Sequence, residues 1–242
     1  MEKKQFENKN FVLYAPDSLK HVYKDMESVL DNTLELYKKL FDVDDFRQVQ
    51  INYFDNIDDF RNFIYDLRGE KDSLPEYAKG TFDKGMINAY IDPSITEKDE
   101  IFNKRVHLAS HELFHIMYKE LVIEKLHTKR VTWFDEGCAQ FFSGEKEYEM
   151  NDGFSTWYKN MRDSIKEVSD LNRLSHGPNF CNEKYNGYDI SLLAVKNIYE
   201  RIGFDGIRSL LRNSNKILEY GDNVLQSANL FYDVKYRGSR GL

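Results

Sequence analysis

The chain has 242 residues, a length that fits one large domain or a domain with an attached lobe. Its 34 Lys and Arg residues and 41 Asp and Glu residues give a formal net charge of −7, and because the basic residues are scattered we expect no nucleic-acid partner. Hydrophobic residues make up 41% of the sequence and aromatic residues 14%, which excludes a disordered chain.

The first ninety residues have the patterns of a small sheet with two helices. Apolar runs and alternation predict strands, and apolar residues at helical spacing after a capping residue predict helices. The expected elements are a strand at 10–15, a helix that ends near Phe41, a strand at 48–54, a helix from Asn56 or Asp58 to Leu67, and a hairpin at 79–92 that turns at 83–85.

From residue 98 onward the pattern is helical almost to the end of the chain. We expect helices at 101–122, 132–143 and 188–202, with a mixed segment up to about residue 184. A sheet-forming half followed by a helical half predicts an α+β fold. We assign residues 1–242 to a single domain, with a sheet half to about residue 122 and a helical half from about residue 123.

The helix expected at 101–122 carries a metal-binding pattern, His111-Glu112-x-x-His115. On a helix, residues four apart project from one face one turn apart, so the two imidazoles form a good start for a Zn²⁺ site. Glu112 follows the first histidine by about 100° around the axis, which directs its carboxylate beside the metal, where it could act as general base on a bound water. The alternative is a buried helix whose histidines are ordinary surface or core residues.

The next predicted helix offers a third ligand, Glu136. Thr132 is positioned to cap this helix, and Gly137 and Ala139 would allow it to approach the first helix closely. Two His and one Glu form a catalytic zinc set, because a fourth position is left for water or substrate. Taken alone, Glu136 is more typical of a carboxylate in the first turn of a helix, and only its combination with the upstream motif favours a ligand.

These two segments, HELFH and WFDEGCAQFF, together resemble the gluzincin metallopeptidases, specifically the peptidase MA-like group with the catalytic core of the aminopeptidase and thermolysin branches. The resemblance is specific over about residues 105–144 and weaker at 10–18 and 188–203. It implies a zincin-like fold, in which an N-terminal twisted sheet and helices pack on the zinc helix and a smaller, mostly helical lobe follows.

The resemblance also implies a chemistry, namely zinc-dependent hydrolysis of peptide bonds. It assigns one Zn²⁺ to His111, His115 and Glu136, and the role of general base to Glu112. The metal would activate the attacking water, and the substrate would be a peptide or a protein.

Two departures from the family pattern affect these expectations. Members of the group often carry an acidic residue four positions after the glutamate ligand, where it orients a zinc histidine, but this chain has Gln140. Aminopeptidases also hold the substrate's amine with a glutamate that precedes the zinc helix, and the nearest stretch here, 85–88, has none. We therefore predict an endopeptidase in which the strand Met86–Ile91 pairs with an extended substrate.

A tyrosine is a second candidate catalytic residue. The segment 188–203 resembles the aminopeptidase-like segment in which a tyrosine about fifteen residues before a glycine faces the zinc and stabilises the oxyanion. Counting back from Gly203 leads to Tyr188. Tyr185 is a nearby competitor, and a tyrosine that only packs at the start of a helix is the alternative.

The remaining histidines and one charged run are weaker candidates. His107 lies one turn before His111, and we expect it to be solvated or to support the site from outside. His127 is expected to be solvated, and His176 is a loop residue without a partner motif. We expect the charged run at 145–149 to be solvated surface.

We thus predict a zinc-dependent metallopeptidase, with a catalytically silent zincin-fold binding module as the alternative. A hydrolase of non-peptide amides would use the same residues. No stretch is long enough to span a bilayer and the first residues lack the apolar segment of a signal peptide, so we expect a cytoplasmic protein without a membrane partner. The sequence does not indicate an oligomeric state.

Overall fold

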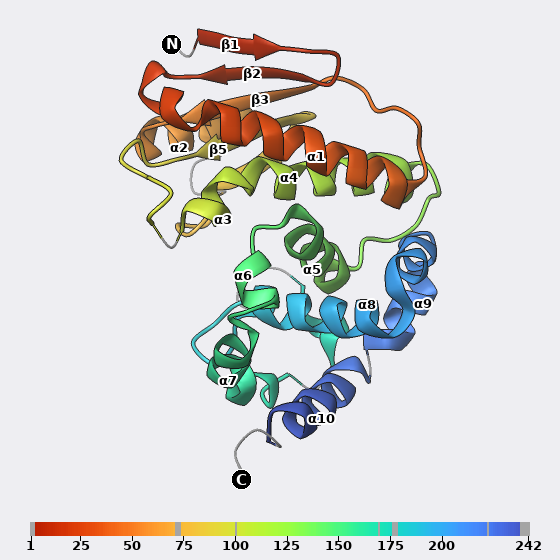
Figure 1. Cartoon of the computed structure of the whole chain (residues 1–242). Helices are drawn as coiled ribbons and strands as arrows, with labels where there is room; N and C mark the ends of the chain where they lie inside the picture. The colour runs from red at the N-terminus through yellow and green to blue at the C-terminus, as the bar shows by residue number, and fades with distance from the viewer. Residues whose placement is uncertain are drawn as a thin grey trace. The chain divides into compact units, whose positions relative to one another are not determined.

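The computed structural model describes residues 3–70, 74–99, 101–168, 170–175, 179–221 and 223–237, and Figure 1 shows the course of the chain. The chain falls into two compact units, the first comprising Met1–Met117 and Ser143–Glu145 and the second Tyr118–Phe142 and Lys146–Leu242. The short segment 143–145 therefore belongs to the first unit, although the segments on either side belong to the second. Among the described helices, none combines the length and the apolar character that crossing a bilayer requires.

A five-stranded mixed sheet forms one layer of the first unit. The strands, in spatial order, are β1 (Lys3–Glu7), β2 (Phe11–Ala15), β3 (Val49–Phe54), β5 (Met86–Tyr90) and β4 (Gly80–Asp83). The three central strands run parallel, and the edge strands β1 and β4 pair antiparallel with their neighbours. Parallel neighbours need crossover connections, and these contain the helices that the sequence predicts between them.

The expected strands at 10–15 and 48–54 and the hairpin at 79–92 are confirmed, whereas β1 was not expected. The hairpin turns where Lys84 and Gly85 both have positive φ, 49° and 76°, as a two-residue turn between β4 and β5 requires. Inside the sheet, Asn52 of β3 donates a hydrogen bond of 2.8 Å to Asn88 of β5, its partner in the register. This bond pairs two buried polar side chains and uses the Oδ1 atom of Asn88, whose buried Nδ2 atom has no hydrogen-bond partner among the described residues.

The helices of the first unit are η1 (Asp17–Val22), α1 (Tyr23–Phe41), α2 (Ile57–Arg68), α3 (Phe102–Val106) and α4 (Leu108–Tyr118). The predicted end at Phe41 is confirmed, and so is the cap of α2, because the Asn56 side chain accepts hydrogen bonds from the backbone of Asp58 and Asp59. The single helix predicted at 101–122 is interrupted at His107 and ends in a π-helical segment, η2 (Lys119–Glu124).

Helix α4 is held against α1 by aromatic packing and one buried hydrogen bond. The Phe114 ring lies 5.5 Å from that of Tyr37 and 5.4 Å from that of Phe41, measured between centroids. The Tyr37 hydroxyl donates to the carbonyl of Ser110 at 3.0 Å. These contacts fix both the position and the rotation of α4 within the unit.

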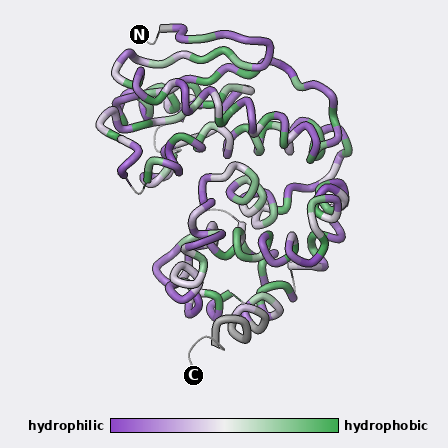
Figure 2. Tube along the Cα trace, viewed as in Figure 1, coloured by the Kyte–Doolittle hydropathy of each residue, from purple (hydrophilic) through white to green (hydrophobic). Residues whose placement is uncertain are grey.

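Apart from one isolated β-bridge between Cys181 and Asn186, the regular secondary structure described in the second unit is helical. After η2 its helices are α5 (Thr132–Ser143), α6 (Glu147–Met150), α7 (Phe154–Ile165), η3 (Leu171–Arg173), α8 (Gly187–Leu211), α9 (Ser214–Gly221) and α10 (Val224–Arg237). The buried run 190–195 makes α8 the core of the unit, and hydrophobic residues follow it in Figure 2. The predicted end near residue 202 is a kink, because Gly203 (φ 65°, ψ −170°) interrupts the helix, which then resumes.

Helix α5 packs on α8 through Gly137. A Cβ atom added at Gly137 would lie 2.4 Å from the carbonyl oxygen of Ser191 and 2.7 Å from the Val195 side chain, so only glycine fits this contact. The expectation that Gly137 lets α5 approach the zinc helix is therefore wrong for this residue. Together the mixed sheet and the helical unit confirm the α+β class.

Candidate metal site

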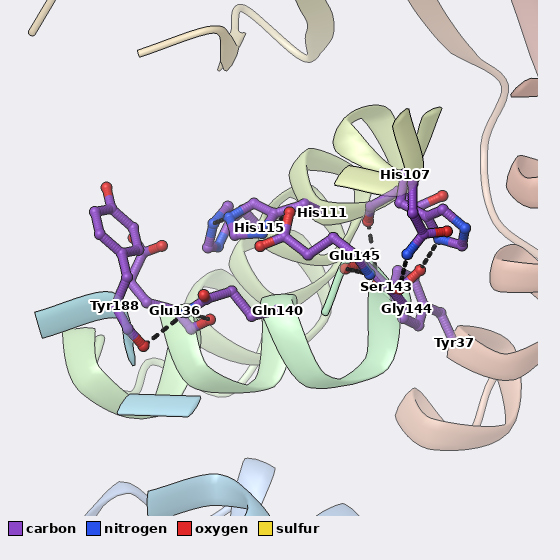
Figure 3. Close-up of polar contacts among 12 residues, drawn as sticks. Tyr37, His107, His111, His115, Glu136, Gln140, Ser143, Gly144, Glu145 and Tyr188 are labelled. Carbon is purple, nitrogen blue, oxygen red and sulfur yellow. Dashed lines mark hydrogen bonds and ion pairs between the residues drawn. The ribbon is translucent and has the colours of Figure 1, made fainter. Parts of the chain in front are cut away.

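Helix α4 carries two buried histidines whose side chains point toward each other. His111 and His115 are 7% and 5% exposed, and their Nε2 atoms lie 3.0 Å apart (Figure 3). In a tetrahedral zinc site with Zn–N bonds of 2.0–2.1 Å, two ligand nitrogens are about 3.3 Å apart. The observed separation also suits a hydrogen bond in which one neutral imidazole donates to the other. The two Nε2 atoms thus face the same point, as the spacing predicts.

Glu112 lies beneath the edge strand β4. Its side chain is largely buried, and a Cβ atom added at Gly80 would be 3.0 Å from its Oε1 atom. In the same strand, the Phe82 ring lies 5.8 Å from that of His115 and is inclined to it by 31°. Strand β4 therefore borders the face of α4 that carries the motif, and the absence of a side chain at Gly80 leaves space for the carboxylate.

Strand β5 does not have the role that the sequence suggested. It pairs with β3 on one side and with β4 on the other, so its backbone groups are used within the sheet. The expectation that Met86–Ile91 pairs with a substrate is therefore wrong. Beyond β4 no further strand pairs in the described part of the chain, so β4 is the edge strand on this side of the sheet and can accept one.

The segment Ser143–Glu145 is a functional candidate that the sequence analysis missed. Gly144 has a φ of 82°, and its carbonyl accepts a hydrogen bond of 2.8 Å from Asn103. The His107 Nδ1 atom contacts the Ser143 carbonyl. Glu145 is only 5% exposed, and its Oε2 atom lies 3.4 Å from His111 Nδ1.

The expectation that the whole run 145–149 is solvated surface is consequently wrong for Glu145, whereas Glu147 is exposed. His107 supports this turn through its ring nitrogen and is only partly exposed. The one local signal was Gly144, a glycine directly after a helix, which is the usual residue where the chain turns in the left-handed conformation. That signal predicts a turn but not which following side chain is buried.

In the second unit, Glu136 is a partly buried residue of α5 that forms an ion pair. Arg130 Nη2 donates to Glu136 Oε1 at 2.9 Å, and Arg130 Nε donates to the buried carboxylate of Asp135. Burial alone would lower the pKa of Arg130, but the two carboxylates raise it above its ordinary value. The guanidinium therefore stays charged and orients both acidic side chains.

Gln140 is one turn beyond Glu136 and connects α5 to the start of α8. Its side chain is buried, and its amide donates to the carbonyl of Tyr188 at 2.9 Å. A carboxylate at this position would place its oxygen against the Tyr188 carbonyl oxygen, and two acceptors cannot form a hydrogen bond. This contact explains why an amide suits position 140 better than an acidic side chain would.

The two candidate tyrosines have different surroundings in the second unit. The Tyr185 hydroxyl donates to the carbonyl of Asn179 at 3.2 Å, within its own loop. Tyr188 is the second residue of α8, its backbone N–H donates to the Asn186 cap, and its ring packs edge-on against Phe180 at 4.8 Å. Figure 3 shows Tyr188 near Glu136 in the same unit. The hydroxyl of Tyr185 is therefore bonded within its loop, whereas Tyr188 is held at the start of α8 by its backbone and its ring.

The sequence-predicted site residues are thus divided between the units. His111, Glu112 and His115 belong to the first, and Glu136 and Tyr188 to the second. The outlying His127 is exposed, as expected, and His176 lies outside the described residues. No protein-family model matches the chain, and a search of curated proteins finds no match. The likeness to the gluzincins therefore depends on the motifs alone.

Proposed function

We propose that this protein is a zinc-dependent endopeptidase of the zincin type, in which His111, His115 and Glu136 hold one Zn²⁺. The observation that carries the proposal is the convergence of the two buried Nε2 atoms, 3.0 Å apart, on a helix that also presents Glu112. Two neutral imidazoles and a carboxylate match the donor set of catalytic zinc. When bound, zinc would polarise a substrate carbonyl and lower the pKa of a water molecule.

The continuity of α5 supports Glu136 as the third ligand. This helix runs without a break from Thr132 to Ser143, and Ser143 belongs to the first unit, where its carbonyl contacts His107. Residues 136–143 rise only about 10 Å along a helix, which limits how far Glu136 is from the turn that carries Glu145. The ion pair with Arg130 involves the Oε1 atom of Glu136.

The chain's own residues then have distinct roles in hydrolysis. Glu112 would accept a proton from the attacking water and pass it to the leaving amine. The Tyr188 hydroxyl would donate to the oxygen that becomes negatively charged, a contact that strengthens in the transition state. The edge strand β4 would pair with the substrate backbone beside Glu112.

Two features support cleavage within a peptide rather than at its amino end. No carboxylate stands at 85–88, and the polar residue of that stretch, Asn88, is fully buried and bonded to Asn52. Nothing in this stretch could therefore capture a substrate's free amine. Pairing along an edge strand recognises main-chain groups and does not need a terminus.

The test combines metal analysis with a cleavage assay on the purified protein. Wild-type protein should hold one zinc per chain and cleave internally quenched peptides of a broad library in preference to aminoacyl chromogenic substrates. Glu112→Gln should keep the zinc and lose turnover by about 10²–10⁴-fold. His115→Ala should lose the zinc, and stoichiometric zinc in that variant would refute the ligand assignment. Bound zinc without cleavage of any peptide would favour a binding module instead.

A further inference from the structure

We infer that Glu145 is a positioning residue for the proposed zinc site, where its carboxylate orients His111 through Nδ1. The inference rests on the proposed function, because it assigns a partner to one of the proposed ligands. It concerns residues of the first unit only.

The two nitrogens of His111 face different partners. Its Nε2 atom lies 3.0 Å from His115 Nε2, and its Nδ1 atom lies 3.4 Å from Glu145 Oε2. An imidazole that binds a metal through Nε2 carries its proton on Nδ1, and a carboxylate that accepts this proton's hydrogen bond fixes the tautomer and the ring orientation. A closing movement of about 0.5 Å would bring the pair to the usual hydrogen-bond distance.

The buried carboxylate of Glu145 needs compensating partners, and the charge of Arg105 also interacts with it, in addition to the contact with His111. A carboxylate that is 5% exposed loses most of its hydration, and proteins retain buried charges where a cation or a donor compensates them. Its neighbour Glu147, in the same charged run, remains exposed. The side chain of Glu145 extends toward the imidazoles of α4 in Figure 3.

The backbone around Glu145 is held in place independently of any metal. Asn103 donates to the carbonyl of Gly144, and the ring of His107 contacts the carbonyl of Ser143. A Cβ atom at Gly144 would lie 2.9 Å from the His107 ring, so this turn requires glycine both for its φ and for space. The turn therefore aims Glu145 at His111 from a fixed position, as a preorganised site requires.

Gln140, which occupies the position of the family's acidic residue, is engaged elsewhere. Its amide donates to the Tyr188 carbonyl within the second unit. Glu145 thus supplies from a turn the charge that position 140 lacks.

The first test is zinc affinity, measured by competition with a chromophoric chelator. Glu145→Gln should weaken binding about 10–100-fold while the apo protein keeps its unfolding temperature. Glu147→Gln, which removes the same charge from an exposed position two residues later, is the matched control and should leave the affinity unchanged. An unchanged affinity in Glu145→Gln, with zinc bound tightly by wild type and lost in His111→Ala, would overturn the inference but not the proposed function.

The second test uses wild-type protein and does not depend on whether the variant folds. In the zinc-loaded protein labelled with ¹⁵N at histidine, the His111 Nδ1–H proton should be observable by NMR and protected from exchange with water. A rapidly exchanging Nδ1–H on zinc-bound His111 would contradict the role of Glu145. If wild type binds no zinc in either experiment, the proposed function itself fails.

Discussion

Two pairs of similar residues near the proposed site differ in their contacts. Tyr185 and Tyr188 are three residues apart, but the hydroxyl of Tyr185 donates to the Asn179 carbonyl, whereas the backbone of Tyr188 is bonded to Gln140 of α5. Glu145 and Glu147 differ in the same way, because only Glu145 is buried. At this scale, the hydrogen-bond partner and the degree of burial distinguish residues of the same type.

Removing one hydroxyl tests the choice of tyrosine. Tyr188→Phe should preserve zinc binding and the fold and lower kcat by about 10²–10³-fold with little change in KM, because the hydroxyl's contact is made mainly in the transition state. Steady-state kinetics on a quenched peptide would measure both constants. Tyr185→Phe is the control with a near wild-type kcat, and the reverse pattern would transfer the role to Tyr185.

The ion pair of Arg130 makes a prediction about stability. Arg130→Met leaves the buried carboxylate of Asp135 without its cation and should lower the free energy of unfolding by about 1–3 kcal/mol. Urea unfolding would measure the loss. Lys166→Met removes the cation of the exposed pair with Asp163 and should change stability by less than about 0.5 kcal/mol. An equal loss of unfolding free energy in Arg130→Met and Lys166→Met would show that the burial of Asp135 does not make its ion pair more important for stability.

Helix α5 connects two sets of contacts. Its middle packs on α8 through the close approach at Gly137, and its last residue, Ser143, belongs to the turn beside His107. A helix that is fixed at its middle and at its last residue holds the side chains that it carries in defined positions. The rigidity of α5 is therefore part of the proposed site, because Glu136 is carried on it.

The substitution Gly137→Ala, which adds one methyl group, tests the contact between α5 and α8. Gly137→Ala would place a Cβ atom 2.4 Å from the Ser191 carbonyl, so the helices must separate despite the better helix propensity of alanine. We expect a loss of about 1–3 kcal/mol in urea unfolding and weaker zinc binding. Gly69→Ala meets no atom within 4 Å and tests the cost of a positive φ alone, which should be about 1 kcal/mol. A Gly137→Ala protein as stable as wild type would contradict the close packing.

At the scale of the whole molecule, the chain crosses between its two units more than once. It leaves the first unit after Met117, returns for Ser143–Glu145, and leaves again. Under the proposed function, one metal ion would bind residues from both units, because His111 and His115 belong to the first and Glu136 to the second. Zinc would then stabilise both units.

The tryptophans allow this coupling to be measured, because both of them, Trp133 and Trp157, belong to the second unit. Free zinc at 100 times its Kd should stabilise the folded state by about 2.7 kcal/mol, and chelation should remove this gain from the unfolding transition followed by tryptophan fluorescence. His111→Ala, a change in the first unit, should abolish the zinc effect on the same signal. The contrary result is that zinc shifts the unfolding transition followed by circular dichroism but not the one followed by tryptophan fluorescence. That result would place the metal on the first unit alone.

The sequence by itself determined the features that depend on neighbours along the chain. A cap at Asn56 or Asp58, the turn at Lys84 and Gly85, and the shared face of His111 and His115 all follow from periodicity and backbone preference within a few residues. The α+β class could be predicted for the same reason, because it depends on the order of such local patterns.

Only the tertiary structure decided the features that depend on distant partners. Strand β4 rather than β5 is the free edge, because β5 pairs on both sides. Gly137 faces α8, and Glu145 is buried against His111. Burial and strand pairing arise from segments far apart in the sequence, and no local pattern in a run of charged residues specifies which one the fold will exclude from water.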